Sequence, residues 1–238
     1  MWLLSRYKPT GIFSLKSSAT TSSGAKTLLV PTMYAVKMAL VDAAFRSGKD
    51  GAEVFEKVKP FEVRFRPPEY AAVTHGFIKV RREREVKDAR NQEAVELKRK
   101  SPFQPTVAYR EFCSFKGDLT VAINVGEGVS WLEELLPVVG YLGKRGSFFQ
   151  FAGFAYVERL PELFTFPLDN PPEEFGLDLV VQPLDDLGER ATFDAISTYS
   201  TGKAKLGRDR VIIQTAVPYK MVSSSRGYTF YRRSDLAG

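Results

Sequence analysis

The order of the predicted elements indicates an α+β protein with a ferredoxin-like domain and an inserted arm. Up to residue 157, the hydrophobic periodicity predicts a strand, a helix, several strands, a second helix and a last strand. This order is typical of a two-layer sandwich in which helices cover one face of a sheet. A highly charged run at 81–100 interrupts it. After Pro161, short apolar runs between prolines predict a smaller β-rich C-terminal part at 158–238.

The N-terminal part is predicted to contain a strand at 2–7, a helix at 33–45 and a short helix at 52–58. Apolar residues recur at helical spacing from Met33 to Phe45, and Ser47-Gly48 ends the pattern. Between the strand and the helix lies a loop rich in Ser, Thr, Gly and Lys.

The middle of the chain is predicted to be mostly extended. Apolar and charged residues alternate at 61–66, and a second extended piece follows at 70–80. The segments 109–115 and 119–125 flank Lys116-Gly117-Asp118, which predicts a hairpin. Further on, the pattern predicts a helix at 131–142 that is bent or shortened at Pro137, and strands at 147–157, 177–181, 211–217 and 228–231.

Charge is segregated along the 238 residues, whose formal net charge is +6. The first 41 residues contain Lys and Arg but no acid, 162–194 is strongly acidic, and 203–233 is basic again. This pattern favours one basic face for a polyanion and one acidic face for solvent or a basic neighbour. An unpatterned surface charge that evens out in space stays open as the alternative.

Several kinds of chemistry find no support in the composition. One cysteine, Cys113, rules out an intrachain disulfide and a cysteine-based zinc site, and the acids have no metal-ligand spacing. The stretch Ser23–Thr27 lacks the spacing of a phosphate loop. We therefore expect no metal and no cofactor. Because no apolar run approaches the length of a membrane span, we expect a soluble cytoplasmic protein.

Binding of single-stranded RNA has the broadest support from the residues. The cationic, hydroxyl-rich loop leads into a helix N-terminus, which suits phosphates. Aromatic residues lie beside basic ones at 6–8, 61–66, 76–82 and 225–233. Aromatic rings stack on unpaired bases while Arg and Lys contact phosphates. Each feature also fits an ordinary polar surface, and the run 81–100 also fits a solvated helix or mobile arm.

A metal-free ribonuclease is the alternative function. It needs a base, an acid and cations around the scissile phosphate, which His75, Tyr34 and Lys37, with Lys79, could supply. A lone histidine is more often structural.

The sequence resembles the Cas-five family of CRISPR-associated proteins, which are RAMP-superfamily subunits of type I Cascade-like surveillance complexes. The matching segments are the N-terminal strand, the S/T-rich loop with T-L-L-V-P-T-M-Y-A-V-K-M-A-L-V-D-A-A-F, and the segments at 65–82, 112–125 and 142–150. The resemblance implies a ferredoxin-like domain at 1–157 with a β-hairpin thumb at about 66–110. It also implies a subunit that grips the 5′ repeat-derived handle of the CRISPR RNA and caps the complex. Its partners would be the backbone and large subunits, with target DNA reached indirectly through the complex.

The resemblance also implies which residues contact the handle. Carried onto this chain, they are Lys16, Ser17, Lys26, Thr27, Tyr34, Lys37, Arg66, His75, Lys79, Arg81 and Arg82. To these we add two basic positions of the first strand and two of a tight turn, Arg6, Lys8, Lys144 and Arg145. The run 84–100 would be the thumb tip, touching guide RNA and a neighbouring subunit.

One branch of the family cleaves precursor RNA with a Tyr, a Lys and a His, the last two adjacent in sequence. Here His75 lies between Thr74 and Gly76, and the glycine-rich C-terminal loop of the related processing ribonucleases is missing. These departures favour a non-catalytic subunit over an endoribonuclease that processes precursor CRISPR RNA. A general RNA-binding protein outside CRISPR systems is a third reading.

Overall fold

The structure is a computed structural model of the chain. It describes residues 1–238 apart from 18–23, 127, 177, 198–199, 202–203 and 237–238. The middle of the predicted hydroxyl-rich loop, Leu177 of the strand predicted at 177–181, and Lys203 therefore lie outside the described residues.

Four antiparallel strands form the central sheet, in the order β3-β6-β1-β7. Their bounds are β1 Trp2–Pro9, β3 Val63–Arg66, β6 Leu119–Asn124 and β7 Phe149–Val157. Helices follow β1 and β6, so the chain runs strand, helix, strand, strand, helix, strand. This connectivity with this strand order is that of a ferredoxin-like sheet, and the predicted α+β fold class is confirmed.

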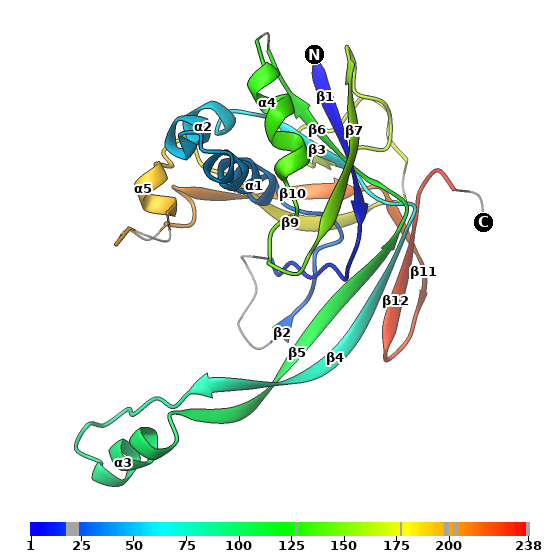
Figure 1. The fold of residues 1–238 in the computed structure, drawn as a ribbon. Coiled ribbons are helices and arrows are strands. Elements are labelled where there is room, and N and C mark those ends of the chain that lie inside the picture. Colours follow the sequence, from blue (N-terminus) through cyan, green and yellow to red (C-terminus); the bar gives the residue numbers. More distant parts are fainter. Residues whose placement is uncertain (18–23, 127, 177, 198–199, 202–203, 237–238) are drawn as a thin grey trace.

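Helices cover one face of this sheet (Figure 1). They are α1 Met33–Arg46, α2 Gly51–Val58, α4 Ser130–Leu135 and the 3-10 turn η1 Leu136–Val138. On β1, Leu3, Ser5 and Tyr7 are buried toward the helices, while Arg6 and Lys8 alternate with them and are exposed. The Tyr7 hydroxyl donates to the Leu136 carbonyl oxygen at 3.0 Å, which ties the sheet to the second helical segment.

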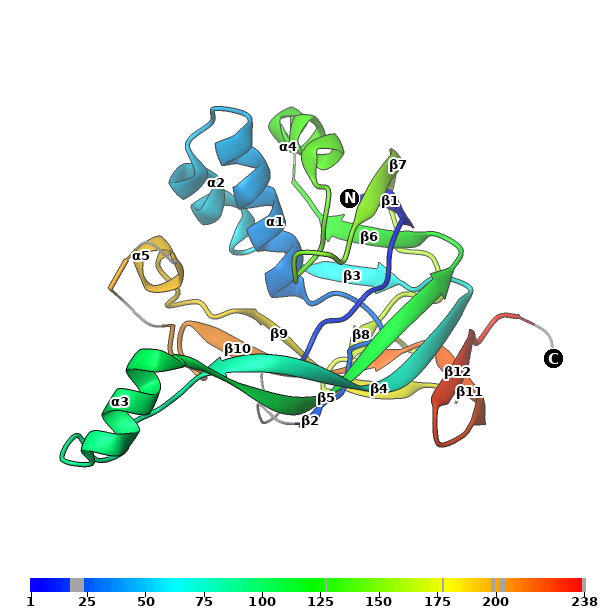
Figure 2. The same cartoon turned by 60° about the horizontal axis from the view of Figure 1, so that its bottom comes forward.

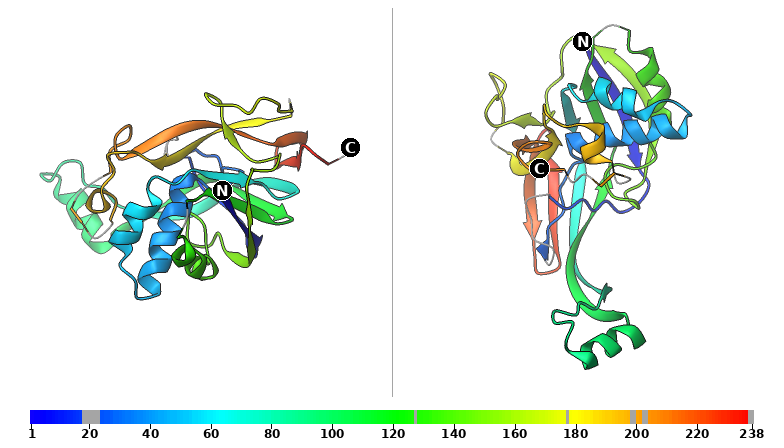
Figure 3. Two further views of the ribbon diagram at one scale, coloured as in Figure 1. Left: turned by 90° about the horizontal axis from the view of Figure 1, so that it is seen from above. Right: turned by 90° about the vertical axis from the view of Figure 1, so that its left-hand side faces the viewer.

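A long β-hairpin projects from the body (Figures 1 and 3). It consists of β4 Tyr70–Glu83 and β5 Phe103–Lys116, and the helix α3 Gln92–Lys100 forms its tip. No residue of α3 is buried. The hairpin spans 70–116 and overlaps most of the segment at about 66–110 where the resemblance implies a thumb. The charged run contains both the end of β4 and a solvated helix.

The predicted hairpin of 109–115 with 119–125 is wrong, although both strands exist. The strand at 109–115 is part of β5, which pairs with β4, whereas β6 pairs with β1 and β3 in another sheet. Gly117 (φ 97°) turns the chain between the two sheets. Val121 and Ile123 of β6 are buried in the core, so burial of the apolar face of β6 between β1 and β3 outweighs the local turn signal.

The C-terminal part adds strands in two places (Figure 2). One group is a three-stranded sheet in the order β8-β10-β9, with β8 Phe166–Pro167, β9 Val180–Leu187 and β10 Arg210–Val217. The C-terminal strands β11 Tyr219–Ser224 and β12 Tyr228–Arg233 extend the hairpin sheet, whose order is β11-β12-β4-β5-β2. At the other edge of this sheet, β2 Gly24–Ala25 of the N-terminal loop pairs with β5. The short helix α5 Phe193–Ile196 lies between β9 and β10.

The C-terminal part shares one hydrophobic core with the rest of the chain. Leu184, Val217 and Tyr219 are buried in the same cluster as Leu40 of α1 and Phe65 of β3. A boundary at 157/158 stays a proposal, based on the end of β7 at Val157. Within the described ranges, no helix has the length and apolarity needed to cross a membrane.

Candidate nucleic-acid interface

A pocket of about 250 Å³ lies beside the start of α1. Five segments of the chain line it. The loop before α1 contributes Leu15 and Lys16, and the helix contributes Thr32, Tyr34, Ala35, Met38 and Ala39. The turn after η1 contributes Tyr141, Gly143 and Lys144, and the strands β9 and β10 contribute Asp185 and Arg210. The ferredoxin-like core and the C-terminal sheet thus form the pocket together.

The first turn of α1 supplies a positive helix end at this pocket. Thr32 is the N-cap, and its Oγ1 accepts a hydrogen bond from the Ala35 N–H at 3.1 Å. The first turn contains no acidic side chain. Because the first turn itself carries no acid, and Asp185 of the pocket wall is ion-paired with Arg210, this helix end favours an anionic group.

Tyr34 presents a half-buried aromatic ring at the pocket. The Arg210 guanidinium lies 4.2 Å from the centre of this ring, a cation–π contact, and it is also ion-paired with Asp185. Burial raises the pKa of the Tyr34 hydroxyl, so it stays protonated at neutral pH. The residue can therefore donate a hydrogen bond or offer its ring to a base.

Two exposed lysines, Lys16 and Lys144, line the pocket, and exposed Arg145 follows Lys144 in the same turn. The backbone of Lys16 is fixed by a β-bridge to Thr27. Gly143 has a φ of 86°, and a Cβ there would come within 2.8 Å of Leu15, so the basic turn requires glycine at this place. The backbone at Lys16 and at Lys144 is therefore held in a defined conformation.

One face of the hairpin carries aromatic and basic side chains together. Directly paired residues of antiparallel strands point to the same face. Along this face, the register pairs His75 with Glu111, Phe77 with Tyr109, Lys79 with Val107, Arg81 with Pro105 and Glu83 with Phe103. Phe77 is 76% exposed and Phe103 is 54% exposed. Large apolar rings open to water beside cations suit stacking on unpaired bases or contact with a partner protein.

His75 connects this face to the loop before α1. Its Nδ1 lies 2.8 Å from the Tyr109 hydroxyl and 3.2 Å from Glu111 Oε1. Glu111 is buried and accepts a hydrogen bond from the Thr27 N–H at 2.8 Å. Because exposed Lys26 precedes Thr27, this chain of contacts places another cation between the pocket and the hairpin face.

Three of the predicted contact residues are buried. Lys37 is 2% exposed, and its ammonium group contacts Asp186 at 2.8 Å and the Lys59 carbonyl oxygen at 2.9 Å. Ser17 and Thr27 are buried too. In this structure Lys37 therefore belongs to the packing of α1 against β9, and its charge is not exposed to a ligand.

The structure also separates other predicted residues from this surface. Arg6 and Lys8 lie on the helix-free face of the central sheet. Arg66 lies on that face as well and contacts Asp235 at 3.7 Å. Arg82 is exposed on the hairpin face opposite to that of Arg81.

The three residues considered for a ribonuclease do not meet in one site. Tyr34 lines the pocket at α1, Lys37 is paired with Asp186, and His75 bonds to hairpin residues. The Nε2 of His75 lies 3.5 Å from the Thr229 hydroxyl. In the described part of the chain, no group of three or more His, Cys, Asp or Glu side chains is arranged to hold a metal ion.

Three residues of this surface, Phe77, Tyr109 and Arg210, are absent from the contact residues predicted from the sequence, although Phe77 lies in the aromatic and basic segment 76–82. Phe77 and Tyr109 lie in segments that were predicted to be strands. Phe77, Lys79 and Arg81 are spaced two residues apart, and this spacing could have placed these three side chains on one face. Arg210 could not be found from the sequence, because its contact with Tyr34 joins segments far apart in the chain.

With the α+β class and the basic, aromatic surface established, the chain can be compared with known proteins. No family model matches the sequence. A curated relative, the CRISPR-associated protein Cas5 of Archaeoglobus fulgidus, is 24% identical over 205 residues, and the match covers 83% of this chain and 83% of the relative. The relative carries the name of the family that the sequence resembles, and this resemblance is confirmed.

Two solved structures are similar over nearly the whole chain. A CRISPR protein from Archaeoglobus fulgidus has 11% identity and a TM-score of 0.45, covering 98% of this chain and 91% of the other. A chain of a CRISPR RNA-guided surveillance complex has 14% identity and a TM-score of 0.49, covering 100% and 94%.

Proposed function

We propose that this protein is an RNA-binding subunit of a CRISPR effector complex. In this proposal it grips the 5′ repeat-derived handle of the CRISPR RNA, caps one end of the complex and does not cut the RNA. The curated relative named Cas5 supports the CRISPR assignment. The single observation that carries RNA binding is the surface that runs from the pocket at α1 to the aromatic hairpin face.

The two parts of this surface suit two parts of a nucleotide chain. At the pocket, Lys16, Lys144 and the positive end of α1 would hold phosphates, while the ring of Tyr34 would stack on a base. On the hairpin, Phe77 would stack while Lys79 and Arg81 contact the backbone. The solvated tip, α3, would contact guide RNA and a neighbouring subunit.

A non-catalytic role is favoured over the endoribonuclease alternative. Catalysis requires the base, the acid and the cation to be near one phosphate. His75 instead contacts Tyr109 and Glu111, and Lys37 is buried against Asp186. No specific observation favours cleavage by this set.

The test uses purified protein, a labelled CRISPR repeat RNA and EDTA in the buffer. A gel shift and a denaturing gel are run on the same samples. We expect binding without cleavage. The double variant Lys16→Glu/Lys144→Glu should bind about tenfold or more weakly, with a shallower salt dependence, because each lost phosphate contact removes about 0.7 from the slope of log K against log salt.

The matched control is Arg159→Glu/Arg190→Glu. Both arginines are exposed and lie outside the proposed surface, and the net charge changes by the same amount. This control should bind nearly as well as the wild type. Equal loss of affinity in both double variants would contradict the proposed surface. A single cut that disappears in His75→Ala would contradict the non-catalytic role.

A further inference from the structure

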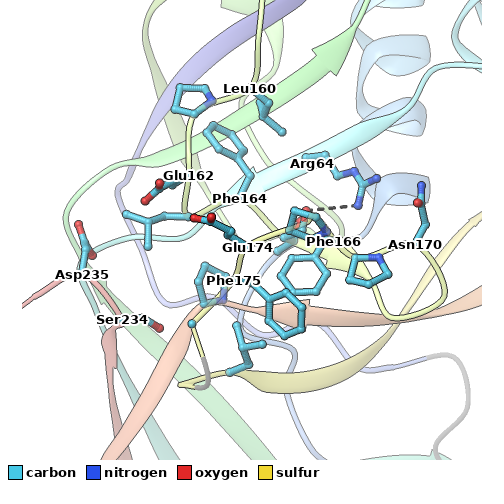
Figure 4. Close-up of a pocket in the computed structure, with 18 of the residues that line it drawn as sticks. Arg64, Leu160, Glu162, Phe164, Phe166, Asn170, Glu174, Phe175, Ser234 and Asp235 are labelled. Atoms are coloured by element: carbon cyan, nitrogen blue, oxygen red, sulfur yellow. Dashed lines mark hydrogen bonds between the residues drawn. The ribbon is translucent and has the colours of Figure 1, made fainter.

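A second pocket lies on the helix-free face of the central sheet. Its volume is about 600 Å³, and it shares no lining residue with the pocket at α1. Trp2 and Arg64 line it from the sheet, where they alternate with buried strand residues. The segment 160–176 lines much of the remainder (Figure 4). The proposed RNA surface does not include this pocket.

The segment 160–176 is fixed to the edge of the sheet. The Thr165 N–H donates to the Phe65 carbonyl oxygen at 2.7 Å, and the Phe65 N–H donates to Thr165 Oγ1 at 2.9 Å. Within the described residues, Leu163 is the one non-glycine residue with a positive φ, at 71°. Such a backbone costs about 1–2 kcal/mol for a residue like leucine, so the surrounding contacts hold the pocket wall in a defined shape.

The centre of the pocket is apolar and open to water. Figure 4 shows the rings of Phe166 and Phe175 side by side, with Phe164 on the side of Leu160. Phe175 is 49% exposed, although its ring lies 5.2 Å from that of Phe166 between ring centres. Prolines 161, 171, 172 and 218 also line the pocket. Phe164 and Phe166 are buried, so Phe175 and the prolines form the apolar surface that a ligand would meet. An exposed aromatic ring in a concave site is typical of a binding site.

Acidic side chains surround this apolar centre. Glu62, Glu162, Glu174 and Asp235 line the pocket, and the basic lining residue Arg64 is ion-paired with Glu62. In the part of the chain that the structure describes, the carboxylates of Glu162 and Glu174 have no ion pair and no hydrogen bond. The pocket therefore carries uncompensated negative charge, in a chain whose net charge is positive.

We propose that this pocket docks a segment of another protein that inserts an apolar side chain and flanks it with lysine or arginine. The apolar side chain would pack against Phe175 and the prolines, and the cations would pair with Glu162 and Glu174. The charge argues against nucleic acid or another anion as the occupant, because the carboxylates repel it. The docking site is thus separate from the proposed RNA surface and independent of it.

The test measures fluorescence polarisation of a short labelled peptide with a central tryptophan flanked by lysines, titrated with the full-length protein. Binding is expected, and a peptide with serine in place of tryptophan should bind much more weakly. The variant Glu162→Lys/Glu174→Lys should weaken binding about tenfold, since two attractive pairs become repulsive. Phe175→Ser should also weaken it.

The matched control is Asp169→Lys/Glu173→Lys, which makes the same charge change in the same segment at residues that do not line the pocket. It should keep most of the affinity. All variants should unfold in urea at the same midpoint as the wild type, which shows that they are folded. Any of three results would overturn the proposal. The two double variants could lose the same affinity for the peptide, the serine peptide could bind as tightly as the tryptophan peptide, or the tryptophan peptide could fail to bind.

Discussion

The side chain of Lys37 lies between α1 and β9, with its charge matched by Asp186. Two effects act on the pKa of Lys37: burial lowers it, and the nearby carboxylate partly offsets this. Asp186 lies 149 residues further along the chain. In the sequence, Lys37 follows Tyr34 by one helical turn, which suggested a cation on the surface. The structure shows instead that the ammonium group of Lys37 is paired with Asp186 inside the protein.

Replacing Lys37 by methionine should destabilise the protein and spare RNA binding. Methionine keeps the apolar stem but leaves the carboxylate of Asp186, which is only 16% exposed, without its partner, which costs about 1–3 kcal/mol. Urea unfolding measures the loss. The double variant Lys37→Met/Asp186→Leu should recover part of it, because no unpaired charge remains.

The matched control for this prediction is Lys16→Met, at an exposed lysine of the proposed surface. It should leave stability within about 0.5 kcal/mol of the wild type and weaken RNA binding. If Lys37→Met unfolded like the wild type and lost RNA affinity instead, Lys37 would be a contact residue and the assignment of its role here would be wrong.

At the scale of elements, the hairpin of β4 and β5 has two distinct faces. Phe77, Lys79 and Arg81 share the face that also carries Tyr109. Ile78 and Val80 lie on the opposite face and are half-buried. The aromatic and basic residues therefore form one continuous strip along the hairpin, which is the arrangement that a single strand of RNA requires.

Phe77→Ala should weaken binding of repeat RNA by about 1–3 kcal/mol, the range for loss of one stacked base. Filter binding at fixed salt measures the change. Ile78→Ala, on the other face of the same strand, is the control and should change the affinity little. Equal effects of the two substitutions would mean that hairpin stability matters and not the aromatic face.

At the scale of the whole molecule, the sequence predicted the ferredoxin-like order correctly because each element has its own hydrophobic period. The helix at 33–45 and the strand at 61–66 could be predicted from local periodicity alone, without knowledge of tertiary contacts. The pairing of 109–115 with 119–125 failed because a turn signal is local, whereas β6 is placed by burial between β1 and β3.

The candidate site was predicted only in part for the same reason. Lys16, Tyr34 and Lys144 do meet at one pocket, although they come from separate segments. The contributions of Arg210 and Asp185 depend on how the C-terminal sheet packs against α1, which no local pattern encodes. The segregation of charge along the chain indicated separate basic and acidic surfaces. The pocket lined by Glu162 and Glu174 is consistent with the acidic one.

The most direct test of the central claim is photo-crosslinking of the protein to a repeat RNA that contains 4-thiouridine, followed by mass spectrometry of the crosslinked peptides. The proposed surface predicts crosslinks in the loop before α1, in the turn at 141–145 and on the hairpin strand at 75–81. Crosslinks confined to the helix-free face, at Arg6, Arg64 or 160–176, would contradict it.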